Sequence, residues 1–186
     1  MLRSPAARVL AALLLSVLAT SRAHAQFMLT SSDVHAGQMM PNAQVYKGMD
    51  CAGGNLSPEL QWKGAPAGTK SFALTVYDPD APTGSGWWHW VVYNIPAAAT
   101  RLAGGAGSTG GTLPPGAVQG NTDFGVPGFG GACPPKGDKP HHYIFTVFAL
   151  NIDKLDIPAG ATAAYVGFNI HAHTVGKATF TALYGR

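Results

Sequence analysis

The sequence has only two cysteines and, beyond its first 25 residues, no excess of basic residues. Its two cysteines, Cys51 and Cys133, are far apart, whereas zinc sites use closely spaced pairs. We therefore expect no metal and no cofactor. Three of the twelve basic residues, Arg3, Arg8 and Arg22, lie among the first 25 residues. The rest of the chain carries nine Lys and Arg against nine Asp and Glu. It lacks the basic surface that displaces counterions from nucleic acids, so we expect no nucleic-acid partner.

The sequence also has no apolar run long enough to span a bilayer as a permanent helix. The longest, Val9–Ala19, is preceded by Arg3 and Arg8 and followed by Ala23-His24-Ala25. A basic start, a short apolar core and small residues around one variable position are the pattern of a secretory signal peptide. We predict that residues 1–25 are a signal peptide and that the protein is periplasmic or secreted, without an integral membrane segment after cleavage. A membrane anchor is the alternative, and the short run disfavours it.

The predicted compartment bears on the two cysteines. In an oxidising environment Cys51 and Cys133 are expected to form one disulfide, which would close a loop of about eighty residues. Two unpaired buried thiols are the alternative interpretation.

Residues 26–186 are long enough for one domain with a sizeable core, and their pattern is mainly β. The run Ala161–His173 has few helix breakers and predicts a helix. Short strands, many turn residues and one or two short helices indicate a mostly antiparallel β-sandwich. Runs rich in β-branched and aromatic residues predict strands at 27–31, 59–63, 72–77, 87–94, 117–120, 142–150 and 177–184.

The stretch Ser71–Pro96 contains the most chemistry. Two carboxylates, Asp78 and Asp80, lie in a Pro-containing loop that ends one strand, and His89 enters the next. Consecutive strands are usually neighbours, so these side chains are expected to lie close together. A small polar cluster within a Trp-rich wall is the composition of a ligand pocket.

Two segments carry a family resemblance: YDPDAPTGSGWWHWVVYNIP and GFGGACPPKGDKPHHYIFTVFAL. The chain resembles the phosphatidylethanolamine-binding protein family, and more narrowly its bacterial YbhB/YbcL, or Raf-kinase-inhibitor-like, branch. The resemblance implies a β-sandwich with a small pocket for anions such as phosphate, acetate or a phospholipid head group. Carried over by position, the pocket would be lined by Asp78, Asp80, His89, His141 and Tyr143, with a backbone N–H near Cys133.

Simpler explanations exist for the acidic residues and for His89. Asp78 and Asp80 flank Pro79 and could be turn residues whose carboxylates cap backbone N–H groups. His89 could be a core histidine bonded to one carbonyl. In a pocket, by contrast, the carboxylates would accept ring N–H bonds, orient the imidazoles and favour their protonated form.

His141 and His142 are adjacent, so only one of them can face a pocket from a strand. We choose His141, because this choice places Tyr143 on the same face.

The residues favour a binding or regulatory protein and not an enzyme. No Ser or Cys occupies a nucleophile setting such as G-x-S-x-G. An uncharacterised hydrolase that uses the Asp and His residues is one alternative. A protein partner is also possible, as for an inhibitor of a protease or kinase that acts through a surface loop. The Gly-, Ala- and Pro-rich stretch Ala97–Gly116 is the candidate for such a loop, and we expect it to take no part in the pocket chemistry.

Overall fold

The computed structural model describes residues 26–186, and the predicted signal peptide lies outside this described part. The helices are a 3-10 helix, η1 (Asn42–Gln44), and α1 (Ala163–His173). The strands are β1 (Met28–Thr30), β2 (Lys47–Gly48), β3 (Cys51–Ala52), β4 (Leu60–Lys63), β5 (Ser71–Asp78), β6 (Trp87–Pro96), β7 (Arg101–Leu102), β8 (Val118–Gln119), β9 (His141–Leu150) and β10 (Thr174–Tyr184).

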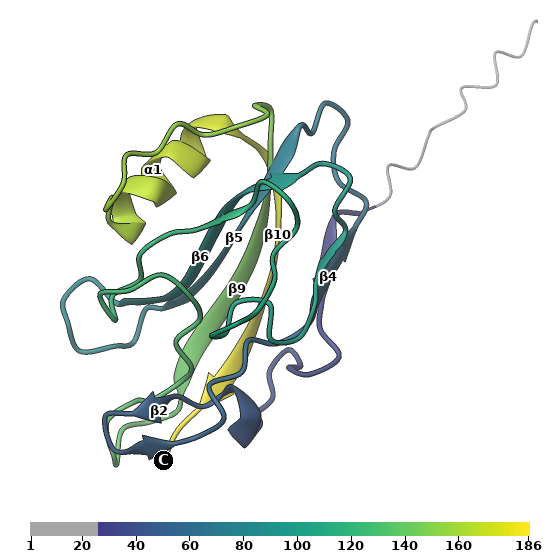
Figure 1. Cartoon of the computed structure of the whole chain (residues 1–186). Helices are drawn as coiled ribbons and strands as arrows, with labels where there is room; N and C mark the ends of the chain where they lie inside the picture. Colours follow the sequence, from purple (N-terminus) through teal and green to yellow (C-terminus); the bar gives the residue numbers. More distant parts are fainter. Residues whose placement is uncertain (1–25) are drawn as a thin grey trace, which may run out of the picture.

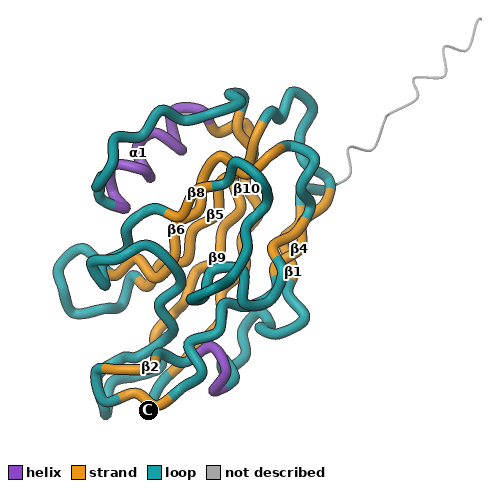
Figure 2. Tube along the Cα trace, viewed as in Figure 1, coloured by secondary structure: helices purple, strands orange, loops and turns teal. Residues whose placement is uncertain are grey.

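The strands form three antiparallel sheets. The largest has the order β10-β9-β5-β6-β8, a smaller one has the order β1-β4-β7, and β2 and β3 form a two-residue hairpin. Figure 1 shows α1 on one face of the large sheet and β4, with the small sheet, on the other. Figure 2 shows that long loops connect these layers.

Burial along β5 follows from its place between two layers. Phe72, Leu74 and Val76 belong to the core shared with the small sheet, where the rings of Trp62 and Phe72 are 5.4 Å apart. Side chains alternate between faces along a strand. Ala73 accordingly belongs to the second core, which lies beneath α1. A strand covered on both faces is apolar throughout, which explains the continuous run that identified it in the sequence.

The predicted helix is confirmed, with its start two residues later. Thr162 precedes it, and its side-chain oxygen accepts a hydrogen bond from the backbone N–H of Tyr165 at 3.2 Å. This contact is an N-cap, which satisfies one of the donors that a helix start leaves unpaired. Val166 and Ile170, four residues apart, are fully buried against the large sheet.

The mainly β fold of residues 26–186, with one α-helix, one 3-10 helix and several short strands, is as predicted. The β2–β3 hairpin and β7 were not predicted, and β10 begins at Thr174, three residues before its predicted start. Within residues 26–186, no helix has the length and apolar character needed to cross a bilayer.

Candidate functional site

Asp78, the last residue of β5, uses its carboxylate to end the strand and to hold a histidine. Its Oδ1 accepts hydrogen bonds from the backbone N–H groups of Asp80, at 2.8 Å, and Ala81, at 3.2 Å. Its Oδ2 lies 2.8 Å from Nδ1 of His141. Asp78 therefore both caps the turn that follows β5 and contacts a ring nitrogen of His141.

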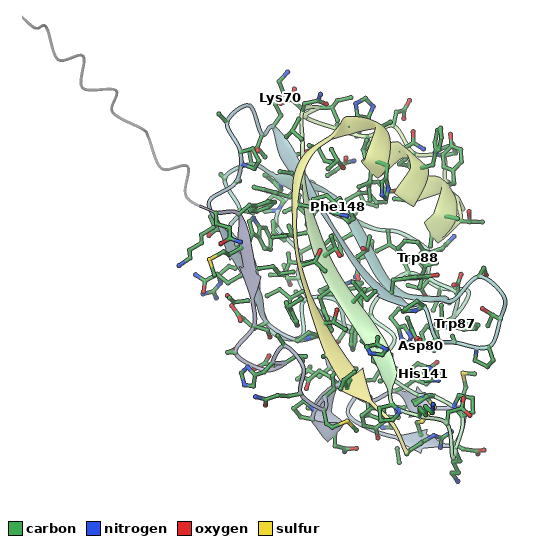
Figure 3. The ribbon with its side chains drawn as sticks, turned by 180° about the vertical axis from the view of Figure 1, so that it is seen from behind. Lys70, Asp80, Trp87, Trp88, His141 and Phe148 are labelled. Carbon is green, nitrogen blue, oxygen red and sulfur yellow. A yellow bond between two sulfur atoms is a disulfide. The ribbon has the colours of Figure 1, made fainter. Side chains whose placement is uncertain are left out.

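His141, the first residue of β9, lies between two carboxylates. Nδ1 faces the buried Asp78, and Nε2 lies 3.4 Å from Oδ2 of the half-exposed Asp138. Both ring nitrogens of His141 therefore face oxygens that can accept hydrogen bonds. Figure 3 shows His141, Asp80 and Trp87 toward one end of the large sheet, far from Lys70 at the other end.

His89 faces the same site because β6 contains a β-bulge. Val76 pairs with Trp90 and Tyr77 pairs with Trp88, so His89 is an extra residue between two successive pairs. A bulge re-aims the side chains beside it. Trp90 thus packs in the core under the small sheet, whereas Trp88 packs beneath α1.

A backbone carbonyl, not a carboxylate, orients the His89 ring. Nδ1 of the buried His89 donates to the carbonyl of Gly130 at 2.8 Å. Burial lowers the pKa of His89, although the Gly130 carbonyl and the Asp78 charge act in the opposite direction. The Asp78 carboxylate thus favours the protonated form of His89, as expected, but burial outweighs this effect. With Nδ1 donating to Gly130, the neutral ring leaves Nε2 as an acceptor.

Tyr143 contributes a hydroxyl group that has no hydrogen-bond partner within the described chain. Tyr143 is two residues after His141 on β9 and is almost completely buried, with its ring 5.1 Å from that of His89. Burial and the neighbouring Asp78 carboxylate raise the pKa of Tyr143 far above its ordinary value. The hydroxyl therefore keeps its proton. The Asp78 side chain and the Cys133 backbone are its polar neighbours, but neither makes a hydrogen bond of normal geometry with it. Burying a hydroxyl unpaired costs about 1–3 kcal/mol.

These groups surround one cavity of about 200 Å³, which we call the Asp78 cavity. Its polar groups lie among apolar and aromatic side chains, and no Lys or Arg of the described chain lines it. The lining residues are Met49, Asp78, Ala81, Pro82, Thr83, Trp87, His89, Phe124, Cys133, Pro134, Pro135, His141 and Tyr143.

Asp80 does not line the Asp78 cavity. Its Oδ2 accepts a hydrogen bond from the backbone N–H of His142 at 2.7 Å and also lies 2.7 Å from Nδ1 of His142. Slight burial opposes ionisation, but the contacts with His142 prevail and lower the pKa of Asp80. Asp80 and His142 thus form an exposed Asp–His pair, which has the same composition as the buried pair Asp78–His141. Of the two adjacent histidines, His141 is the one at the cavity, as predicted.

The mouth of the Asp78 cavity is held by a disulfide. Cys51 of β3 and Cys133 are bonded, with their Cα atoms 6.0 Å apart. This bond joins the β2–β3 hairpin, which carries Met49, to the wall that begins at Cys133. Arg186 adds a second connection, because it donates to the carbonyls of Pro134 and Asp50 at 2.7 and 2.9 Å.

Phe124 is the principal lining residue that the sequence did not single out. Its ring stacks on Tyr46 at 4.5 Å and lies edge-on to His89 and Trp87, each at 5.4 Å. A Cβ at Gly130 would overlap this ring, so glycine is required for the close approach. The interleaved aromatic residues and glycines of the 123–135 loop are the signal that could have identified it.

Within residues 26–186, no group of three or more His, Cys, Asp or Glu is arranged to hold a metal ion.

Comparison with known proteins gives consistent matches. The family whose sequence model matches residues 30–185 is described as phosphatidylethanolamine-binding protein. UPF0098 protein YbcL of Escherichia coli K12 is 55% identical over 161 residues, which cover 86% of this chain and 88% of YbcL. UPF0098 protein YbhB of the same organism is 52% identical over 156 residues, which cover 84% of this chain and 98% of YbhB.

Solved structures agree with these matches. The crystal structure of E. coli YbcL, described as a member of the mammalian PEBP family, superimposes with a TM-score of 0.85 at 54% identity, covering 87% of this chain and 99% of that one. CT736 of Chlamydia trachomatis has a TM-score of 0.71 at 29% identity, with 86% and 97% of the two chains covered.

Proposed function

Since the chain belongs to the phosphatidylethanolamine-binding protein family, we propose that it is an exported, non-catalytic protein that binds a small phosphate-bearing ligand in the Asp78 cavity. The observation that carries this proposal is the Tyr143 hydroxyl, which is buried and unpaired within the described chain. A ligand oxygen would supply the missing acceptor and offset the cost of leaving the donor unpaired.

The charges of the cavity favour a ligand that brings both an anion and a donor. Tyr143 offers a hydrogen-bond donor to phosphate oxygens, and His141 offers Nε2 where the ligand replaces its 3.4 Å contact with Asp138. Asp78 and the neutral His89 ring offer acceptors, and a simple dianion would be repelled by the carboxylate. A phosphate monoester that retains a proton, or a head group with an ammonium such as phosphorylethanolamine, satisfies both sides. An ammonium group in the cavity would also make a cation–π interaction with the ring of Trp87, which lines it.

The size of the cavity supports a head group or free phosphate ester as the bound portion. Its volume of about 200 Å³ is below the roughly 300–1,000 Å³ of sites that enclose drug-sized molecules. An acyl chain would have to lie outside.

Two features support a binding role without catalysis. The sulfur of Cys133 is committed to the disulfide, and the hydroxyl of Thr83 donates to the carbonyl of Gly86. Neither lining residue is therefore an activated nucleophile. The positioned Asp78–His141 pair is the feature that would favour a hydrolase, and a panel of chromogenic esters and phosphates tests that alternative. We expect no turnover.

Export is supported by the N-terminal pattern and by the disulfide between Cys51 and Cys133, since such bonds persist in oxidising compartments. Fractionation of cells that express the full chain tests it, and we expect the processed protein outside the cytoplasm.

The decisive experiment is a calorimetric titration with phosphorylethanolamine and, separately, inorganic phosphate. Tyr143→Phe removes only the hydroxyl, so we expect about tenfold weaker binding. The free energy of unfolding should not fall, because the lost hydroxyl makes no internal hydrogen bond in the described chain. Tyr165→Phe, on the exposed face of α1, is the matched control and should bind as the wild type does. Equal affinities for the Tyr143 variant and the wild type would remove the basis of the proposal.

A further inference from the structure

A second cavity lies beside the Asp78 cavity, and its chemistry differs. It has a volume of about 310 Å³, and we call it the Gln119 cavity. It lies between the loop around residues 107–111 and the segment 119–130. The lining residues are Tyr46, Asn55, Gly107, Ser108, Thr109, Gly110, Gly111, Gln119, Thr122, Phe124, Val126, Pro127, Gly128, Phe129 and Gly130.

The Gln119 cavity is polar but uncharged. No Asp, Glu, Lys, Arg or His of the described chain lines it. The polar groups are side-chain amides, hydroxyls and the backbone of glycine-rich loops. Such a site has no charge with which to select an anion or a cation, and its polar surface disfavours an acyl chain.

The wall of the cavity is rigidly built. The Asn55 amide accepts from the backbone N–H of Gly131 at 2.7 Å and donates to the carbonyl of Phe129 at 3.3 Å. On the other side, the backbone N–H groups of Gly105 and Gly107 donate to the carbonyl and hydroxyl oxygens of Ser57. The Ala97–Gly116 stretch is therefore embedded at this point, in contrast to the surface loop that the sequence suggested.

Gln119 supplies unused hydrogen-bond donors. Its Oε1 accepts a hydrogen bond from Nε1 of the buried Trp90 at 2.9 Å, which fixes the orientation of the amide. The Nε2 group of Gln119 makes no hydrogen bond within residues 26–186, and the same holds for the hydroxyls of Tyr46 and Thr109. The cavity thus combines a pre-oriented amide donor with two hydroxyls that can donate or accept.

Aromatic rings complete the lining. Tyr46 stacks on Phe124 at 4.5 Å, and Phe129 packs edge-on against Trp90 at 5.7 Å. Aromatic surface beside amides and hydroxyls suits a molecule that has both C–H faces and many hydroxyl groups.

We propose that the Gln119 cavity is a second binding site, which takes a neutral, hydroxyl-rich ligand of the saccharide class. Each sugar hydroxyl is both donor and acceptor, so it can pair with the Gln119 amide and with the hydroxyls of Tyr46 and Thr109. The cavity volume is at the lower end of the range for small-molecule sites, which fits one or two sugar rings. This site does not depend on the ligand proposed for the Asp78 cavity.

Phe124 gives the proposal a structural readout. Its ring lines both cavities and lies 5.4 Å from His89. A sugar in the Gln119 cavity contacts this ring from the side away from Asp78, so the signals of Phe124 should shift while the Asp78 cavity remains available.

The test is an NMR titration of the uniformly ¹⁵N-labelled protein with glucose, galactose, N-acetylglucosamine, maltose and N,N′-diacetylchitobiose. We expect at least one of these sugars to shift the amide signals of residues 107–111 and 119–130, with a dissociation constant on the order of 1 mM. The absence of such shifts for all five sugars would overturn the proposal, as would shifts confined to the Asp78 cavity.

Gln119→Glu identifies the donor. The substitution keeps an oxygen for Nε1 of Trp90 but replaces the amide donors with a carboxylate, and we expect sugar binding to weaken at least tenfold. Gln61→Glu makes the same change at an exposed position of β4 and should have no effect. Both variants should bind phosphorylethanolamine as the wild type does, so failure of one site is distinguishable from failure of the other. Unchanged sugar affinity in Gln119→Glu would refute the role of the amide.

Discussion

Asp78 and His141 form a hydrogen-bonded pair at 2.8 Å, with side chains that are only 3% and 5% exposed. The pair connects the end of β5 to the start of β9. Asp80 and His142 form a second pair of the same composition at 2.7 Å, with side chains that are 40% and 56% exposed. The two pairs share a contact between a carboxylate oxygen and Nδ1 and differ in burial, so they allow a buried pair to be compared with an exposed one.

Asp78→Asn should destabilise the protein by about 2 kcal/mol, because the new amide presents a donor to Nδ1 of His141 in place of an acceptor. The opposed donors are avoided when the neutral His141 ring carries its proton on Nε2 and presents Nδ1 as an acceptor. Denaturant unfolding measures the first effect, and ¹⁵N chemical shifts of the His141 ring measure the second. Asp80→Asn is the matched control, and the exposed pair should cost less than about 1 kcal/mol. Equal losses of unfolding free energy in the two variants would show that burial does not determine how much such a pair stabilises the protein.

The stability of the protein should fall as the pH drops below 6.5, through His89. Burial lowers the pKa of His89 from its ordinary value of 6.5. Between the two values the unfolded chain takes up a proton that the folded chain does not, so the free energy of unfolding rises with pH, by up to about 1.4 kcal/mol per pH unit for one group.

His89→Gln tests this assignment, because a glutamine amide can still donate to the Gly130 carbonyl but does not titrate. We expect a flatter pH profile of unfolding between pH 6.5 and 5 in the variant. Asp80 does not contribute to the profile in this pH range. Its pKa is lowered from 3.8, so its stabilising contribution is lost only at more acidic pH. Parallel profiles for the variant and the wild type would contradict the role of His89.

Loss of the disulfide should affect both stability and binding. Replacing Cys51 and Cys133 by serine opens a loop with a sequence separation of 82, and we expect the free energy of unfolding to fall by about 4 kcal/mol. Met49 and the Cys133 wall would no longer be joined, so phosphorylethanolamine should also bind more weakly. Unfolding and titration of the wild type with and without reductant give the measurement. The serine variant is the control and should not respond to reductant; a wild type that does not respond either would refute the prediction.

Much of the fold could be read from residue patterns, since strands covered on both faces are long and apolar. β5 and β9 are of this kind, and the capped helix α1 is the longest segment with few breakers in its half of the chain. The β2–β3 hairpin is different. It turns through Met49 and Asp50, which have positive φ angles of 51° and 63°, and such a turn is usually signalled by glycine or asparagine.

The family resemblance predicted most of the residues of the candidate site. In the structure, Asp78, His89, Cys133, His141 and Tyr143 lie around one cavity. Their role in binding remains a prediction. The placement of Asp80 could not be predicted, because the choice between cavity and turn depends on which adjacent histidine each carboxylate meets. The charge state of His89 could not be predicted from the sequence either, since it depends on burial and on the carbonyl of Gly130, 41 positions away.

The extra residue in β6 means that the composition of the Asp78 cavity depends on a count of positions as well as on residue types. If β6 were one residue shorter at this point, Trp88 and Trp90 would pair with Tyr77 and Val76 in a regular ladder, without the extra position that His89 occupies. A relative whose β6 lacks this extra residue would therefore lack the second imidazole at its cavity. When relatives are aligned, a gap in this strand is thus more informative about the ligand preference of a relative than most substitutions of residues that line the cavity.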